Sequence, residues 1–430
     1  MLFRNITTVD ENFELKEHMY IGIKGDRIDY VSDSAPAEDY GEVYEGENKL
    51  LIPAFYNTHT HLPMFLLRGY AENLPLMTWL QDRIFPFEDQ LTQEDCYYGC
   101  LMGIAEMLRF GIIGATDMYL GYDSVGRAFA ESGVKANFAR GCTCWDVVSY
   151  FDLPIYKEAL AAIEKYQGYD NGRLHVDFSL HAEYTTNEAI VKTIAQAAAE
   201  HNVAMHVHVS ETSGEVEACR ERHGNRSPVR YLADCGLFDA PTVAAHCVHI
   251  DDDDIAILKE HNVTVATCPK SNAKLSSGIC PVSSLLKAGV NVSIGTDSVA
   301  SNNNLNMIEE MRFFNLLQKA TTGDPTVITP AQTLYAATRA GALAQQRQDC
   351  GCIKEGFKAD ITVLDTDTVY MKPAHNMLNN LIYSSSGNDV VLTMADGRIL
   401  YKDGVYTTID IEKINFECEK SLKRIVSELK

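Results

Sequence analysis

The sequence predicts an α/β protein: a (β/α)8 barrel of the TIM-like type, joined to a small β-sandwich domain that both chain ends form together. Three observations lead to this prediction. Short apolar strands alternate with helical patterns through the middle of the chain. Both ends instead show strands separated by tight turns. Polar side chains recur just after the predicted barrel strands, where barrels of this kind carry their functional residues.

The strand pattern at the two chain ends predicts the sandwich domain. The predicted terminal strands are 19–23, 28–31, 359–364 and 390–394. Polar turns separate them, and one of these turns contains an Asp-Gly pair that is typical of hairpins. We expect residues 1–50 and 355–430 to form one composite domain that ends in an amphipathic helix from about Ile411. Residues 51–354 then form the barrel.

The middle of the chain supplies the barrel strands. In chain order, the predicted strands are 51–57, 112–116, 135–140, 174–181, 203–209, 242–246, 263–267 and 291–295. Helical patterns such as 188–201 and 254–261 lie between them. A doubly wound open sheet is the alternative. That fold favours a glycine-rich phosphate loop after its first strand, and the sequence has none there.

Composition narrows the function classes. The chain has 430 residues, which is long for one simple core, and its hydrophobic content of 46% is ordinary for a globular protein. Its net charge is −22 and it has no basic run, so we expect binding neither to nucleic acid nor to anionic membranes. The twelve cysteines form no CxxC pair and the N-terminus shows no secretion-signal pattern. We therefore expect reduced thiols and a cytoplasmic enzyme.

His59 and His61 are the strongest local signal for a metal site. Residues two apart on an extended strand point the same way, so these imidazoles can meet one ion. Other polar residues at the ends of predicted strands are Arg140, His181, His208, Glu211, His246 and Asp297. The carboxyl ends of barrel strands meet at one rim, so we expect these side chains to share one site.

Several neighbouring polar residues have structural explanations. The strand 203–209 carries both His206 and His208. We expect His208, nearer the rim and close to Glu211, to be the ligand, and His206 to pack behind it. We expect a structural role for His249. The acidic run 251–254 is expected to begin a helix, where carboxylates interact favourably with the helix dipole.

Three imidazoles and one carboxylate suit a borderline divalent metal, with zinc first and iron or manganese as alternatives. Such an ion lowers the pKa of a bound water from ~15.7 toward ~7. Asp297 can accept the proton of that water, and Glu211 can carry a proton to the substrate. His246 is either a further ligand or the group that orients the water. The segment 178–182 has no lysine that could bridge two ions, so we expect one metal per chain.

A set of motifs spread over nearly the whole chain carries a resemblance to a known family. The motifs are 53–61, 67–74 with 79–80, 244–249, 269–275, and 295–298 leading to 301–305. In these motifs the chain resembles the amidohydrolase superfamily, and within it the 5-methylthioadenosine/S-adenosylhomocysteine deaminases. The resemblance implies hydrolytic deamination at C6 of an adenosine-type nucleoside. The implied substrates are 5′-methylthioadenosine, 5′-deoxyadenosine and adenosine, and the products are an inosine-type nucleoside and ammonia.

The resemblance also implies roles for individual residues. The implied metal ligands are His59, His61, His208 and Asp297. Glu211 is implied as the proton shuttle and His246 as the residue beside the reacting water, and Glu211 and Asp297 would also contact the substrate. Glu88 is implied to hold the ribose hydroxyls, His181 to contact the purine or ribose, and Arg140 to reach the far end of the substrate.

The chain departs from the family pattern at one place. The family usually carries a second arginine shortly after the one that matches Arg140, and the pair grips the carboxylate of an amino-acid tail. Here residues 141–150 contain no basic side chain and include Asp146. We therefore expect S-adenosylhomocysteine to be a poorer substrate than nucleosides with uncharged 5′-groups.

Two other hypotheses stay open. One is deamination or dechlorination of a free heterocycle, as guanine deaminases and triazine hydrolases perform. The other is a catalytically inactive barrel that serves as an assembly scaffold, which the retention of all four implied ligands disfavours. For partners we expect a small nucleoside, no nucleic acid, no membrane, and self-association as a homo-oligomer.

Overall fold

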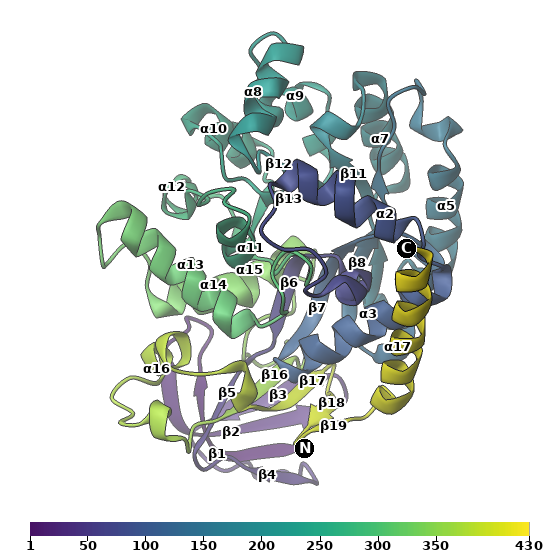
Figure 1. Ribbon diagram of the computed structural model, residues 1–430. Coiled ribbons are helices and arrows are strands. Elements are labelled where there is room, and N and C mark those ends of the chain that lie inside the picture. Colours follow the sequence, from purple (N-terminus) through teal and green to yellow (C-terminus); the bar gives the residue numbers. More distant parts are fainter. Residues whose placement is uncertain (430) are drawn as a thin grey trace.

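Two parallel sheets and one largely antiparallel sheet organise the protein, as a computed structural model of residues 1–429 describes it (Figure 1). The first parallel sheet has the order β10-β8-β7-β6 and the second the order β15-β14-β13-β12-β11-β9. Their strands are β6 (Phe55–Thr60), β7 (Ile112–Met118), β8 (Lys135–Ala139), β9 (Gly141–Cys142), β10 (Leu174–Val176), β11 (Phe178–Ala182), β12 (Met205–Val209), β13 (Thr242–His246), β14 (Thr264–Thr267) and β15 (Val292–Ile294). The mixed α/β class and the parallel pairing agree with the sequence prediction.

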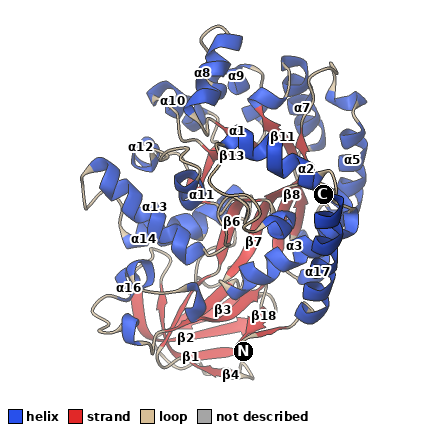
Figure 2. Ribbon diagram, in the orientation of Figure 1, coloured by secondary structure: helices blue, strands red, loops and turns tan. Residues whose placement is uncertain are grey.

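Helices connect the parallel strands or follow the last of them, and they cover these strands on the outside (Figure 2). They are α3 (Gln93–Arg109), α4 (Tyr122–Ser132), α5 (Pro154–Tyr166), α7 (Glu188–His201), α8 (Ser213–Arg222), α9 (Pro228–Asp234), α10 (Asp252–Glu260), α11 (Pro269–Lys274), α12 (Val282–Ala288), α13 (Met307–Thr322), α14 (Pro330–Ala337) and α15 (Arg339–Ala344). Because helices cover them, strands such as β12 and β13 are buried along their whole length.

Helix α7 illustrates how the sequence sets these elements. The side chain of Asn187 accepts a hydrogen bond from the Ile190 N–H (3.0 Å) and so caps the first turn. The buried residues of α7 recur at helical spacing, which gives the helix one apolar face. Asn202 adopts a left-handed conformation, with φ of 50°, and ends the helix. The prediction of a helix over residues 188–201 is confirmed.

Two predicted barrel strands are each divided in the structure. The predicted strand 51–57 consists of β5 (Lys49–Pro53), which belongs to the antiparallel sheet, and of β6. Pro53 has no N–H to donate to a sheet, and the chain changes sheets directly after it. The predicted strand 174–181 divides into β10 and β11 at Asp177, a buried residue whose carboxylate accepts hydrogen bonds from Asn137. The other six predicted strands match observed strands to within about two residues.

The two parallel sheets adjoin at both of their ends. At one end, the Asp297 N–H donates to the His59 carbonyl (2.9 Å), and the Thr58 hydroxyl donates to the Ile294 carbonyl (3.0 Å). These bonds hold the end of β15 beside β6. At the other end, β8 continues after one residue into β9, which pairs with β11.

Both chain ends contribute to the antiparallel sheet, which we call the terminal sheet. Its order is β19-β18-β17-β16-β5-β1-β2-β3, with β4 beside β1. The strands not yet given are β1 (Leu2–Val9), β2 (Leu15–Lys24), β3 (Arg27–Ser32), β4 (Val43–Glu45), β16 (Ile361–Asp365), β17 (Val390–Ala395), β18 (Arg398–Lys402) and β19 (Val405–Tyr406). Purple and yellow strands, from opposite ends of the chain, accordingly lie together in Figure 1.

Buried charges join the terminal sheet to the parallel strands. The Lys135 ammonium on β8 lies 2.7 Å from a carboxylate oxygen of Asp360 and 2.7 Å from one of Asp396. Lys135 and Asp360 are almost completely buried, and the Tyr56 hydroxyl donates to Asp360 as well. The helix α17 (Ile411–Glu428) adds a second link, because it packs along α3, where Arg424 pairs with Asp95.

Within residues 1–429, no helix combines the length and the apolar character that a membrane crossing requires. All twelve cysteines are unpaired, and all but Cys144 are buried.

Candidate active site

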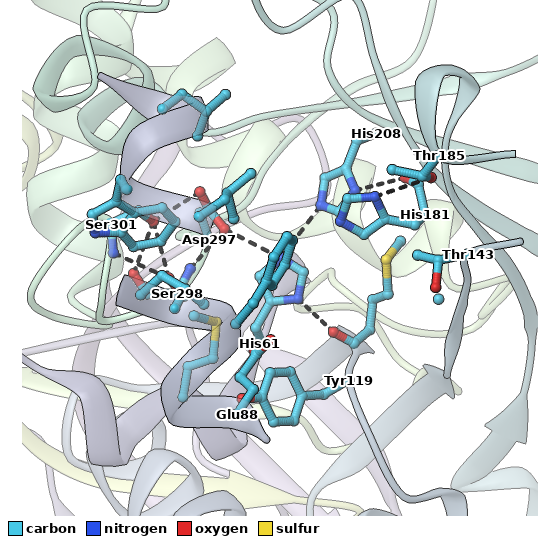
Figure 3. Close-up of a pocket in the computed structure, with 18 of the residues that line it drawn as sticks. His61, Glu88, Tyr119, Thr143, His181, Thr185, His208, Asp297, Ser298 and Ser301 are labelled. Carbon is cyan, nitrogen blue, oxygen red and sulfur yellow. Dashed lines mark hydrogen bonds and ion pairs between the residues drawn. The ribbon is translucent and has the colours of Figure 1, made fainter. Parts of the chain in front are cut away.

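A cavity of about 610 Å³ lies at the carboxyl ends of the parallel strands. The predicted site residues that line it are His61, Glu88, Arg140, His181, His208, Glu211, His246 and Asp297. His59, the remaining predicted residue, is completely buried and contacts the ring of His61 edge to face. In Figure 3, Asp297 and His208 lie on opposite sides of His61, while Glu88 and Tyr119 lie together farther along the cavity. The structure thus brings every predicted site residue to one place.

The predicted metal ligands form a tight cluster. Oδ1 of Asp297 lies 3.6 Å from Nε2 of His59 and 3.4 Å from Nε2 of His61. Nε2 of His208 lies 3.3 Å from Nε2 of His61. One potential ligand atom from each of His59, His61 and His208 lies within 4.8 Å of the others, and the same holds for His59, His246 and Asp297. Four ligand atoms are therefore directed at one small volume.

The other nitrogen of each ligand imidazole is already engaged. Nδ1 of His61 donates to the carbonyl of Met118, and Nδ1 of His208 donates to the carbonyl of His181 (2.7 Å). A carbonyl only accepts, so both rings carry their proton on Nδ1 and turn a lone pair on Nε2 into the cluster. Nδ1 of His59 lies 2.8 Å from Nε2 of His206. This contact confirms that His206 packs behind the cluster.

One orphaned atom indicates what the cluster holds. Nε2 of His59 is buried and has no hydrogen-bond partner among the described residues. A buried polar atom without a partner is costly unless a ligand satisfies it. Three neutral imidazole nitrogens and one carboxylate oxygen form a donor set that suits a divalent metal. The residues present therefore fit the metal that the sequence predicts.

Burial sets the protonation states of the cluster. Burial lowers the pKa of His59 to about 3 and holds the pKa of His208 well below its usual value, so both rings are neutral at pH 7. Burial opposes ionisation of Asp297, but the neighbouring imidazoles, His59 first, outweigh it and hold the pKa of this carboxyl well below its usual range. Neutral imidazoles and an ionised carboxylate are the forms that bind metal.

A short segment after β14 orients two site residues, one at the end of β13 and one in the chain after β15. The Ser271 hydroxyl donates to Oδ2 of Asp297 (2.6 Å), and Nδ1 of His246 lies 2.9 Å from Oδ1 of Asn272. Ser301 adds a second hydroxyl to Asp297 (2.8 Å). The residue-by-residue prediction missed Ser271 and Asn272. The only signal for them is the motif 269–275, which contains both.

Glu211 and His246 face each other at the inner end of the cavity. Nε2 of His246 lies 3.9 Å from Oε2 of Glu211, and the Ser277 hydroxyl donates to Oε1 of Glu211 (3.2 Å). Nε2 of His249 bonds the carbonyl of Ser277 (2.6 Å), which confirms its structural role. The acidic run also behaves as predicted, because Asp251 caps α10.

The outer part of the cavity is lined by a helical segment formed by α1 (Leu76–Trp79), η2 (Leu80–Ile84) and α2 (Phe85–Glu88). Burial raises the pKa of Glu88 to about 7, and the nearby Tyr119 hydroxyl opposes this rise. Arg140 lines the cavity, but its guanidinium already has an ion-pair partner. Its guanidinium pairs with Glu158 at 2.6 Å.

Parallel strands that present three imidazoles and a carboxylate at one open cavity define a metal-dependent hydrolase. Residues 50–400 match the model of the amidohydrolase family. A 5-methylthioadenosine/S-adenosylhomocysteine deaminase of Thermoanaerobacter pseudethanolicus is 39% identical over 99% of both chains. The chain belongs to the amidohydrolase family, and within it to the group of these deaminases.

Solved structures agree with this assignment. A zinc-bound adenosine deaminase from Xanthomonas campestris superposes with a TM-score of 0.91 at 30% identity, over 99% of this chain and 98% of the other. A zinc complex of atrazine chlorohydrolase from Arthrobacter aurescens superposes with a TM-score of 0.90 at 21% identity, over 98% and 99% of the two chains. At that identity the second likeness shows the fold alone.

Proposed function

We propose that the protein catalyses metal-dependent hydrolytic deamination at C6 of an adenosine-type nucleoside and releases ammonia and an inosine-type product. The observation that carries this proposal is the pairing of two carboxylates in one cavity. Glu211 lies beside His246 at the ligand cluster, whereas Glu88 lines the outer part of the same cavity. A free base needs only the first carboxylate. A nucleoside also presents a sugar diol, which the second can bind.

The proposed architecture is a closed (β/α)8 barrel over residues 51–354 with a β-sandwich built from residues 1–50 and 355–430. The bonds that join β15 to β6 support closure of the two parallel sheets. The terminal sheet encloses one apolar cluster that includes Phe3, Ile21, Ile361 and Leu392. The backbone pairing of Arg27 with Lys358 supports a sheet folded back on itself.

The proposed cofactor is one divalent ion per chain, zinc first, held by His59, His61, His208 and Asp297. When bound, the ion makes a water reactive at neutral pH. The remaining chemistry belongs to side chains. Asp297 accepts one proton of the water through a carboxylate oxygen. Glu211 carries the other proton of the water to a ring nitrogen of the purine, and it then passes the proton held by Asp297 to the departing amine. Nε2 of His246 orients the water toward C6.

Substrate recognition is assigned to the outer cavity. Glu88 accepts hydrogen bonds from the ribose hydroxyls, His181 contacts the purine or ribose, and Arg140 reaches the 5′-end. The ion pair between Arg140 and Glu158, and the missing second arginine, favour uncharged 5′-substituents over the amino-acid tail of S-adenosylhomocysteine. Homo-oligomeric assembly and a cytoplasmic location stay predictions from the sequence.

A substrate panel tests the proposal. Adenosine, 5′-deoxyadenosine, methylthioadenosine and S-adenosylhomocysteine are compared with guanine and a chlorinated triazine, and ammonia, chloride and the organic product are each measured. We expect inosine-type products from the nucleosides and no turnover of the free heterocycles. Turnover of guanine or the triazine alone would contradict the proposal and support the alternative, deamination or dechlorination of a free heterocycle. Absence of bound metal together with absence of all turnover would favour the scaffold hypothesis.

A further inference from the structure

Glu215 is a buried carboxylate for which the proposed mechanism has no use. It lies in the first turn of α8, shortly after Glu211, and only 8% of the residue is exposed. Both of its oxygens are engaged by consecutive backbone groups. Oε1 accepts from the N–H of Ser210 (2.8 Å), and Oε2 accepts from the N–H of Glu211 (2.7 Å). Burial and the neighbouring Glu211 raise the pKa of this carboxyl to about 7, whereas the two hydrogen bonds favour its ionised form.

These two bonds are not the usual ones for a glutamate in this position. Thr212 caps α8, and its hydroxyl accepts from the Glu215 N–H (3.2 Å). In a capping box, a glutamate at the third helical position returns its side chain to the N–H of the cap residue. Glu215 instead makes its two short hydrogen bonds with the two residues before Thr212. Its carboxylate therefore fixes the chain that leaves β12.

The segment that Glu215 fixes is a sharp turn. Ser210 has a φ of 51°, a left-handed conformation that is unfavourable for a residue with a side chain. The N–H groups of Val248 and His249 donate to the Ser210 carbonyl at 3.1 and 2.9 Å. The turn is therefore held from one side by the chain after β13 and from the other by Glu215. Its geometry decides where the side chain of Glu211 enters the cavity.

We propose that Glu215 is a positioning residue for Glu211. By accepting both N–H groups it holds the Ser210–Glu211 backbone so that Oε2 of Glu211 stays on the side of His246 (3.9 Å). The proposal rests on the proposed function in one respect, the role of Glu211 as proton carrier. Glu215 itself touches neither the metal ligands nor the cavity among the described residues.

The first test is Glu215→Gln. The amide keeps the size of the side chain but replaces one acceptor oxygen with a donor group, which cannot accept from a backbone N–H. We expect kcat to fall roughly 10–100-fold, as for the loss of a charged hydrogen bond, while KM stays within about threefold. Metal content per chain should equal that of the wild type. Glu217→Gln, an exposed position on the same helix, is the matched control and should leave kcat unchanged.

A double-mutant cycle separates positioning from general support of the fold. If Glu215 acts through Glu211, adding Glu215→Gln to Glu211→Gln should lower kcat by less than about threefold further. Multiplied losses would overturn the proposal, and so would a single Glu215→Gln variant with kcat within twofold of the wild type. If Glu215→Gln does not fold, the same cycle is run with Glu215→Asp, which keeps both oxygens but shortens their reach.

The cycle also distinguishes this proposal from the proposed function. Should the wild type turn over a free heterocycle and no nucleoside, the proposed substrate fails, and the cycle is measured with that heterocycle instead. Should Glu211→Gln be fully active, the proton role of Glu211 fails, and the positioning role of Glu215 fails with it.

Discussion

The guanidinium of Arg140 and the carboxylate of Glu158 meet at 2.6 Å beside the cavity. Arg140 is the only arginine or lysine among the described residues that line this cavity. Four carboxylates line it as well: Glu88, Asp89, Glu211 and Asp297. An anionic substrate tail therefore enters a site whose single permanent cation already has a partner.

The first prediction concerns this tail. S-Adenosylhomocysteine should have a kcat/KM roughly 10–100-fold below that of methylthioadenosine, because one charged hydrogen bond to its carboxylate is missing. Since half-exposed ion pairs are worth about 0–1 kcal/mol, Glu158→Gln should raise the relative rate with S-adenosylhomocysteine by at most about fivefold. Glu164→Gln, an exposed position on the same helix, controls for net charge. If S-adenosylhomocysteine is the best substrate of the panel, another cation must reach its tail.

Replacing the proposed metal ligands should remove the ion. His59→Ala and His208→Ala each delete one imidazole from a buried cluster, so elemental analysis should show loss of metal, and activity should disappear with it. His375→Ala, an exposed histidine outside the cavity, should retain the metal. Full metal occupancy in both ligand variants would contradict the assignment.

Glu211→Gln should separate metal binding from proton transfer. The amide cannot carry a proton, so turnover should fall roughly 10²–10⁴-fold, whereas metal content should match that of the wild type. Metal analysis and steady-state rates on the same preparation check both halves of this prediction. Near-normal turnover would show that another group shuttles the proton.

Glu88→Ala should discriminate between sugar and base recognition. The proposed partner of this carboxylate is the ribose diol, so all ribosides should lose kcat/KM. Loss of a charged hydrogen bond corresponds to roughly 10–100-fold. The corresponding 2′,3′-dideoxynucleosides lack the diol and should be affected far less. An equal loss for nucleosides with and without the diol would contradict the assignment.

The pKa of Glu88 predicts a pH dependence. Because burial raises this pKa to about 7, the carboxyl is largely protonated below pH 6 and largely ionised above pH 8. The ionised form is the stronger acceptor for two hydroxyls, so KM for ribosides should fall as pH rises through 7. Glu88→Gln has no such titration and should remove this dependence. A KM profile that is the same in both proteins would assign the titration to another group.

Much of the fold could be predicted because its signals are local. The alternation of apolar segments with helical patterns predicted the positions of most parallel strands. The two-residue spacing of His59 and His61 on one predicted strand identified both as candidate metal ligands. The division of the predicted strand 51–57 was missed because its apolar run is continuous. Only Pro53 marks the point at which the chain changes sheets.

The rest of the site depends on contacts between residues that are distant along the chain. Ser271 reaches Asp297, and Glu158 neutralises Arg140. No periodicity connects such pairs, so their contacts follow only from the folded arrangement. Glu215 combines a local sequence signal with a contact that only the structure reveals. Its spacing from Thr212 resembles a capping box, and only the structure shows that its carboxylate binds elsewhere.

The pairing of β5 with β16 has a consequence for the order in which the protein can be completed. β5 ends at Pro53, and β16 begins about three hundred residues later, at Ile361. At translation rates of ≈ 5–20 residues per second, the ribosome needs roughly 15–60 s to deliver that partner strand. Throughout this interval one edge of β5 has no native partner and is open to pairing with other nascent chains. The N-terminal strands are thus made first but can be among the last to reach their final environment.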